Sequence, residues 1–283
     1  MREVSGTRQL DIHTTSTVEF EPPCPSLSKM PEHRRWNERP STGMAWCCDA
    51  KRKDANMDSA KPPLREGLAS MITVHHLGVS QSERVVWLCE ELGIPYTLRR
   101  YDRDPTTRLA PAEYKALHPM GIAPVITDGD VVLAESGAIL EYLMARYGGG
   151  SLSVGSKQPN FPDYLFWFHF ANGTLMPSEM GSMIANFLGL KDGNPIIAML
   201  KARSERAFLL VEGRLEDAAY FAGNAFTAAD IMMLFPLTTM RAFVQKDLTA
   251  FPNIKAYLKR IGARPAYQRA MQKGDPGMSP KLD

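Results

Sequence analysis

Residues 118–143 read HPMGIAPVITDGDVVLAESGAILEYL and contain a turn, two short apolar runs and the start of an amphipathic pattern. The runs Pro124-Val125-Ile126-Thr127 and Val131-Val132-Leu133 flank Asp128-Gly129-Asp130, a combination that predicts an antiparallel hairpin. Glu135-Ser136-Gly137 follows at once, and apolar residues then recur at the spacing of one helical face until the glycines at 148–150. A hairpin followed directly by a helix is therefore predicted here.

Upstream of this segment, strand and helix patterns alternate. Residues 72–77 are β-branched and apolar enough for a strand, and the helical pattern that follows ends at Gly93. A second strand is predicted from Tyr96 to about Tyr101, and another helix opens at Ala110-Pro111-Ala112-Glu113, with proline in its first turn. The resulting order, β-α-β-α-β-β-α, is a thioredoxin-like layout.

The remainder of the chain is helical in pattern, and Pro and Gly mark its breaks. We therefore expect an α/β thioredoxin-like domain at 71–153, followed by an all-α helical bundle at 159–275. Residues 1–70 show no sustained period and carry many prolines, so we expect a disordered N-terminal extension. This segment lacks the apolar core of a secretory signal and the acid-poor composition of a transit peptide, so a cytoplasmic location is expected.

The composition excludes several classes of protein. The chain has 283 residues and a formal charge of +2, which gives no reason to expect a nucleic-acid partner or an anionic membrane surface. No run approaches the ~20 apolar residues of a membrane-spanning helix. The 4 cysteines include no CxxC pair, and Cys24, Cys47 and Cys48 lie in the extension, so we expect neither a disulfide framework nor a metal site.

Several motifs resemble the cytosolic glutathione S-transferase family over roughly residues 71–271. SQSER at 80–84 resembles the serine-bearing loop of theta-like members, including microbial and fungal types, and LAESGAILEYL at 133–143 is similar to the glutathione-holding Glu/Gln-Ser motif. HPMGIAPVITDG resembles the turn before the family's cis-proline, and FAGNAFTAADIMML at 221–234 resembles the signature of its helical domain. The resemblance implies the glutathione transferase fold, glutathione as co-substrate and no metal.

The resemblance implies a glutathione site built on this hairpin and helix. If Pro124 is cis, the backbone of Val125 is expected to be free of a neighbouring strand and to pair with the cysteinyl residue of glutathione. A plain edge-strand proline is the alternative. Glu135 and Ser136 lie at a helix N-terminus, which favours the γ-glutamyl carboxylate, while Glu135 pairs its ammonium group. The alternative is an ordinary Ser N-cap beside an acid.

Ser80 is the predicted catalytic residue. A thiol pKa near 8.5 leaves only a few per cent of free glutathione as thiolate at neutral pH. Lowering it by about two units requires ~2.7 kcal/mol, which a hydroxyl hydrogen bond and a helix N-terminus together supply in order of magnitude. Ser82 is the second candidate. In a third interpretation, both serines act only as helix caps. Arg84 is expected to support the loop through a salt bridge.

Other residues bear on the type of reaction and on how glutathione is held. No cysteine stands at Val79 or Ser80, so thiol–disulfide exchange is disfavoured, and Cys89 is predicted to be a core residue. Ile122 stands where many relatives have Lys or Gln, which leaves the glycyl carboxylate of glutathione without an assigned partner, and His118 is expected to act in the turn.

The helical region supplies large, soft side chains for a core and for an apolar substrate pocket. They are Phe161, Phe166, Trp167, Phe168, Phe170, Met176, Met180 and Met183. Phe226-Thr227-Ala228-Ala229-Asp230-Ile231 predicts a capping box in which Asp230 is structural rather than catalytic. The resemblance implies that the protein conjugates glutathione to electrophilic, largely apolar small molecules and forms a homodimer. A non-catalytic binding or assembly module and a glutathione-dependent peroxidase are the alternatives.

Overall fold

The computed structural model describes residues 72–190 and 193–283. The predicted extension at 1–70 and its cysteines lie outside the described residues. The described residues belong to one compact unit, and in their ranges no helix is both long and apolar enough to cross a membrane.

The sheet has four strands, β1 (Ile72–Leu77), β2 (Thr97–Tyr101), β3 (Val125–Asp128) and β4 (Val131–Ala134), in the order β2-β1-β3-β4. Strands β1 and β2 are parallel, while β3 is antiparallel to both β1 and β4. The predicted hairpin and the thioredoxin-like order of elements are therefore confirmed.

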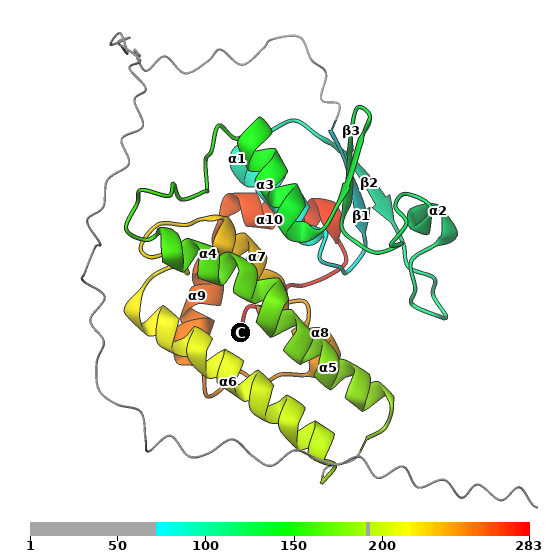
Figure 1. Cartoon of the computed structure of the whole chain (residues 1–283). Coiled ribbons are helices and arrows are strands. Elements are labelled where there is room, and N and C mark those ends of the chain that lie inside the picture. Colours follow the sequence, from blue (N-terminus) through cyan, green and yellow to red (C-terminus); the bar gives the residue numbers. More distant parts are fainter. Residues whose placement is uncertain (1–71, 191–192) are drawn as a thin grey trace, which may run out of the picture. The chain divides into compact units, whose positions relative to one another are not determined.

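Three helices accompany the sheet: α1 (Glu83–Leu92), α2 (Ala112–Lys115) and α3 (Ser136–Arg146). Figure 1 shows α1 and α3 together on one side of the sheet and α2 on the other. Helix α1 ends as predicted, because Gly93 adopts φ +63° and its N–H bonds the Cys89 carbonyl. Helix α2 is shorter than its pattern suggested: Pro111 is the N-cap rather than a first-turn residue, and a tight turn before Pro119 ends the helix.

The remainder of the described chain is helical, as predicted. Its elements are α4 (Phe161–Phe170), the π-helical turn η1 (Ala171–Leu175), α5 (Met176–Phe187), α6 (Pro195–Asp217), α7 (Ala228–Leu237), α8 (Arg241–Val244), α9 (Pro252–Gly262) and α10 (Pro265–Gly274). Helix α1 packs against both α7 and α10, and a single apolar cluster joins Val74 and Ile126 of the sheet to Phe208 and Ile231 of the helices. The two predicted domains share one core.

Candidate functional site

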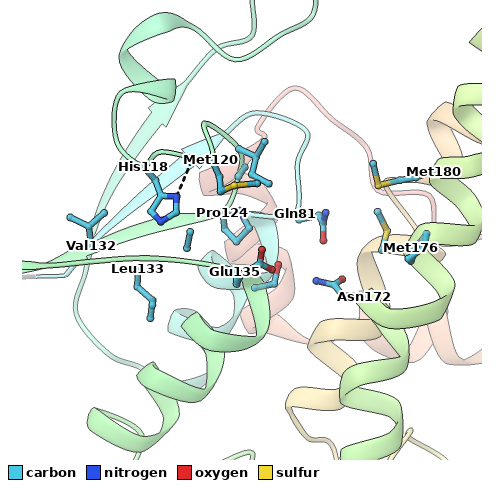
Figure 2. A pocket seen from close by; sticks show the side chains of 15 residues that line it. Gln81, His118, Met120, Pro124, Val132, Leu133, Glu135, Asn172, Met176 and Met180 are labelled. Carbon is cyan, nitrogen blue, oxygen red and sulfur yellow. Dashed lines mark hydrogen bonds between the residues drawn. The ribbon is translucent and has the colours of Figure 1, made fainter.

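A pocket of about 410 Å³ lies where the hairpin and the start of α3 face the π-helical turn and α5. Figure 2 shows Gln81, Glu135 and Asn172 around the same space, with Met176 and Met180 beyond them. The pocket is lined by Gln81, His118, Met120, Ile122, Ala123, Pro124, Val132, Leu133, Ala134, Glu135, Ser136, Asn172, Met176, Pro177 and Met180. Its polar residues are Gln81, His118, Glu135, Ser136 and Asn172, and the other lining residues are apolar.

Glu135 and Ser136 both line this pocket at the N-terminus of α3. Glu135 is the N-cap residue and adopts φ +72°, a conformation that is strained for a residue with a side chain. Its exposed carboxylate makes no cap bond, while Ser136 is buried at the first helical position. Ser136 is therefore not the N-cap, and the site presents a carboxylate, a hydroxyl and free helical N–H groups together.

The Ala123–Pro124 peptide bond is cis, as the resemblance implied. Ala123 and Pro124 line the pocket, whereas Val125 does not appear in its wall and is 1% exposed. Val125 lies in register with His75 of β1 and with Ala134 of β4. The expectation that its backbone has no neighbouring strand is wrong, because the hairpin ladder already begins at Val125.

Ser80 lies behind the pocket rather than in its wall. It is 5% exposed, and its hydroxyl donates to the Leu77 carbonyl at 2.7 Å and lies 2.8 Å from Ser82 Oγ. Ser82 is fully buried at the N-cap of α1 without a side-chain cap bond. Its Oγ lies 2.9 Å from His76 Nδ1 instead. Ser80 as the donor to a sulfur anion stays a prediction.

Arg84 connects the two sides of the pocket. Its Nη1 donates to Gln81 Oε1, to Asn172 Oδ1 at 2.9 Å and to Ser136 Oγ at 3.4 Å. The residue is 1% exposed, and burial lowers the pKa of its guanidinium to about 9, which leaves it charged at neutral pH. Within the described ranges Arg84 makes no ion pair, so the salt bridge expected from the sequence is replaced by hydrogen bonds to neutral groups.

His118 and Ile122 occupy the hairpin end of the pocket. The backbone N–H of Met120 donates to His118 Nδ1 at 3.2 Å, which confirms the role of this histidine in the turn. Because Nδ1 accepts that bond, Nε2 of the neutral ring carries the proton and acts as a donor. Ile122 is half exposed and offers no polar group, as its sequence position indicated.

The large apolar residues of the helical region differ in where they lie. Met176 and Met180 line the pocket, and Met176 is also buried against Phe235 and Met240. Trp167, Phe168 and Phe170 are buried in the main core, whereas Phe166 is 50% exposed. Cys89 is completely buried, and burial raises the pKa of its thiol to about 12, so its prediction as a core residue is confirmed. In the residues for which the structure gives positions, no group of three His, Cys, Asp or Glu side chains is placed to hold a metal ion.

Comparisons with known proteins agree with this architecture. Residues 80–146 match the family model described as "Glutathione S-transferase, N-terminal domain", and residues 194–265 match "Glutathione S-transferase, C-terminal domain". The chain is 33% identical over 220 residues to glutathione S-transferase 3 of Schizosaccharomyces pombe, which covers 72% of this chain and 88% of the relative. It is 28% identical to glutathione S-transferase 1 of Saccharomyces cerevisiae, over 72% of this chain and 95% of the relative.

A solved structure is similar in both sequence and fold. The crystal structure of a glutathione S-transferase from Actinobacillus pleuropneumoniae is 35% identical, with a TM-score of 0.66, and the match covers 72% of this chain and 93% of that one. The chain belongs to the glutathione S-transferase family.

Proposed function

We propose that the protein is a glutathione transferase that conjugates glutathione to electrophilic, largely apolar small molecules. The observation that carries the proposal is the pocket itself, which places the Glu135 carboxylate and the N-terminus of α3 opposite the methionines of α5. The γ-glutamyl carboxylate fits the positive end of α3, and Glu135 pairs the γ-glutamyl ammonium group. Ser136 adds its hydroxyl to the same end of the ligand.

The rest of the ligand follows the hairpin. The cysteinyl backbone lies along the edge formed by Ala123 and Pro124, which line the pocket, whereas Val125, predicted from the sequence to make this contact, is paired on both sides within the sheet. The glycyl carboxylate accepts a hydrogen bond from His118 Nε2, a partner that takes over from the apolar Ile122. The sequence pattern indicated a turn role for His118 only, because its place in the pocket wall depends on the tertiary structure.

The reaction needs a sulfur anion beside an apolar cavity. The thiol loses its proton to solvent, and the thiolate attacks the electrophilic carbon, forming a carbon–sulfur bond as the leaving group departs with its electron pair. For an activated alkene, the electron pair moves onto the adjacent carbon, which then takes a proton. The pocket contributes proximity and stabilisation of the anion rather than a covalent intermediate.

Ser136→Ala tests the proposed binding mode. We expect glutathione affinity to fall by about tenfold, because the variant loses a hydrogen bond to a charged group. Isothermal titration measures the affinity, and initial rates with a panel of electrophiles measure conjugation. Ser151→Ala, an exposed serine outside the pocket, is the matched control and should bind glutathione like the wild type.

The same measurements separate the alternatives. A wild-type protein that binds no glutathione would refute the proposal, and tight binding without any turnover would identify a non-catalytic module. Turnover of hydroperoxides but not of carbon electrophiles would identify a glutathione-dependent peroxidase.

We further propose that the protein acts in detoxification in the cytoplasm as a homodimer. Large apolar side chains are exposed on three elements near the pocket: Val131 and Val132 of β4, Leu165 and Phe166 of α4, and Ile184 and Phe187 of α5. Exposed apolar side chains on these three elements suit an interface with a second copy of the chain.

Phe166→Glu should shift the protein from dimer to monomer, because the substitution places a charge in an apolar interface. Phe166 is 50% exposed, so the monomer itself should stay folded. Analytical ultracentrifugation measures the mass, and Leu209→Glu, at a 56% exposed site on α6, is the control that should remain dimeric. A wild-type protein that sediments as a monomer would contradict this assignment.

A further inference from the structure

The side chain of Arg84 fixes the orientation of two amides in the pocket wall. A guanidinium carries only donors, so the groups that face it at Gln81 and Asn172 must be the amide oxygens. The two amide nitrogens therefore point away from Arg84, and both side chains line the pocket. For the part of the chain that the structure describes, neither amide nitrogen has a hydrogen-bond partner of its own.

Arg84 is buried, and two of its three side-chain nitrogens, Nε and Nη2, lack a hydrogen-bond partner among the described residues. Its guanidinium lies 5.5 Å from the centre of the Phe235 ring. A charged group left partly unpaired in the interior is costly, and its field reaches far in a water-poor surrounding. The positive charge stands directly behind Gln81 and Asn172.

The position of Asn172 agrees with the place that the proposed binding mode gives to the sulfur of glutathione. Asn172 belongs to the π-helical turn between α4 and α5, a geometry that is rare and frequent at functional sites. With the γ-glutamyl end at Ser136 and the cysteinyl backbone along Pro124, the sulfur faces the helical side of the pocket. Asn172 is there, one turn before Met176.

We propose that the amide N–H groups of Asn172 and Gln81, oriented by Arg84, donate hydrogen bonds to the sulfur anion of bound glutathione. Asn172 and Gln81 are then catalytic residues, and Arg84 is a positioning residue that also supplies positive potential. The inference rests on the proposed function and names the groups that make the thiolate. The sequence predicted Ser80 as the donor to the sulfur. In the structure, the single hydroxyl proton of Ser80 is donated to the Leu77 carbonyl.

The test is a titration of the thiol in the complex of glutathione with the full chain, followed by thiolate absorbance against pH. Asn172→Ala should raise the thiol pKa by about one unit, which is a tenfold loss of thiolate below that pKa. Asn172→Asp should raise it further, because a carboxylate repels the anion. Arg84→Lys keeps a charge but cannot hold both amides, and should give a smaller rise.

Two controls separate this role from a structural one. The first is S-methylglutathione, which has no ionisable thiol: its affinity should be the same for Asn172→Ala as for the wild type. The second is Asn186→Ala: Asn186 is an exposed amide on α5 outside the pocket, and this variant should leave the thiol pKa unchanged. A raised pKa in Ser80→Ala with none in Asn172→Ala would overturn the inference. Failure of the wild type to bind glutathione would instead overturn the proposed function.

Discussion

Asp230→Ala should lower the free energy of unfolding by about 3–5 kcal/mol, because it leaves several buried donors without an acceptor. Asp230 is 0% exposed, and its carboxylate accepts from Thr227 N at 2.8 Å, Phe221 N at 3.0 Å and Tyr257 Oη at 3.2 Å. The predicted capping box of α7 thus also secures the preceding loop and α9. Asp230 lies outside the pocket, which agrees with its structural assignment.

Urea unfolding followed by circular dichroism measures this effect. If the variant does not fold at all, Asp230→Asn, which retains one acceptor oxygen, should fold with an intermediate loss. Asp247→Ala is the matched control, since Asp247 accepts from Thr249 in an exposed turn and should cost about 1 kcal/mol or less. Equal losses in the free energy of unfolding for Asp230→Ala and Asp247→Ala would contradict a stabilising role of the buried hydrogen bonds of Asp230.

Glu83→Gln should remove a pH dependence of stability that the wild-type protein shows between pH 6 and 8. Glu83 is 5% exposed, its Oε2 accepts from Thr239 Oγ1 at 2.7 Å, and its Oε1 is buried with no hydrogen-bond partner in the described ranges. Burial raises the pKa of this carboxyl from 4.5 to about 8, against the opposing effects of Thr239 and Arg84. The folded protein therefore holds a proton here at neutral pH.

The direction of the effect follows from proton binding. The folded state holds a proton on Glu83 that the unfolded state has released above about pH 4.5, so stability is fully present below that pH and falls as the pH rises to about 8. In this window the slope is about 1.4 kcal/mol per pH unit. Glutamine has the shape of the protonated acid and does not titrate, so Glu83→Gln should lack this contribution.

The experiment compares urea unfolding of wild type and variant at pH 6, 7 and 8. Burial also raises the pKa of Asp230, to about 6, so Asp230 still titrates at the lower end of this range; it is present in both proteins, and its contribution therefore cancels when Glu83→Gln is compared with the wild type. Glu113→Gln, an exposed carboxyl, is the control and should keep the wild-type slope. Parallel slopes for wild type and Glu83→Gln would show that Glu83 is ionised in the folded protein.

Turns and helix ends that are formed by residues close together in the sequence were predictable from it. The hairpin follows from Asp128-Gly129-Asp130, the end of α1 from Gly93, and the start of α7 from Thr227 and Asp230, because turns and caps are closed by atoms a few residues apart. The family resemblance extended this to the cis bond at Pro124.

The errors and omissions concern residues whose partners are distant in sequence. The backbone of Val125 is flanked by two strands, and Arg84 finds neutral acceptors instead of the expected ion pair. Ser80 has a hydroxyl of the expected type, but its hydrogen bond to Leu77 depends on how tightly the loop turns into α1. Neither spacing nor residue type specifies which atom accepts a hydroxyl proton.

The amino-acid sequence by itself determined the α/β-then-helical architecture and the presence of Glu135 and Ser136 at a helix start, since both follow from periodicity and local hydrogen bonding. Only the tertiary structure decided that Asn172 meets Arg84 across 88 positions of the chain and that both amides face one pocket. Such contacts form when the shared core closes, because packing of α1 against the helical region brings these side chains within hydrogen-bond distance.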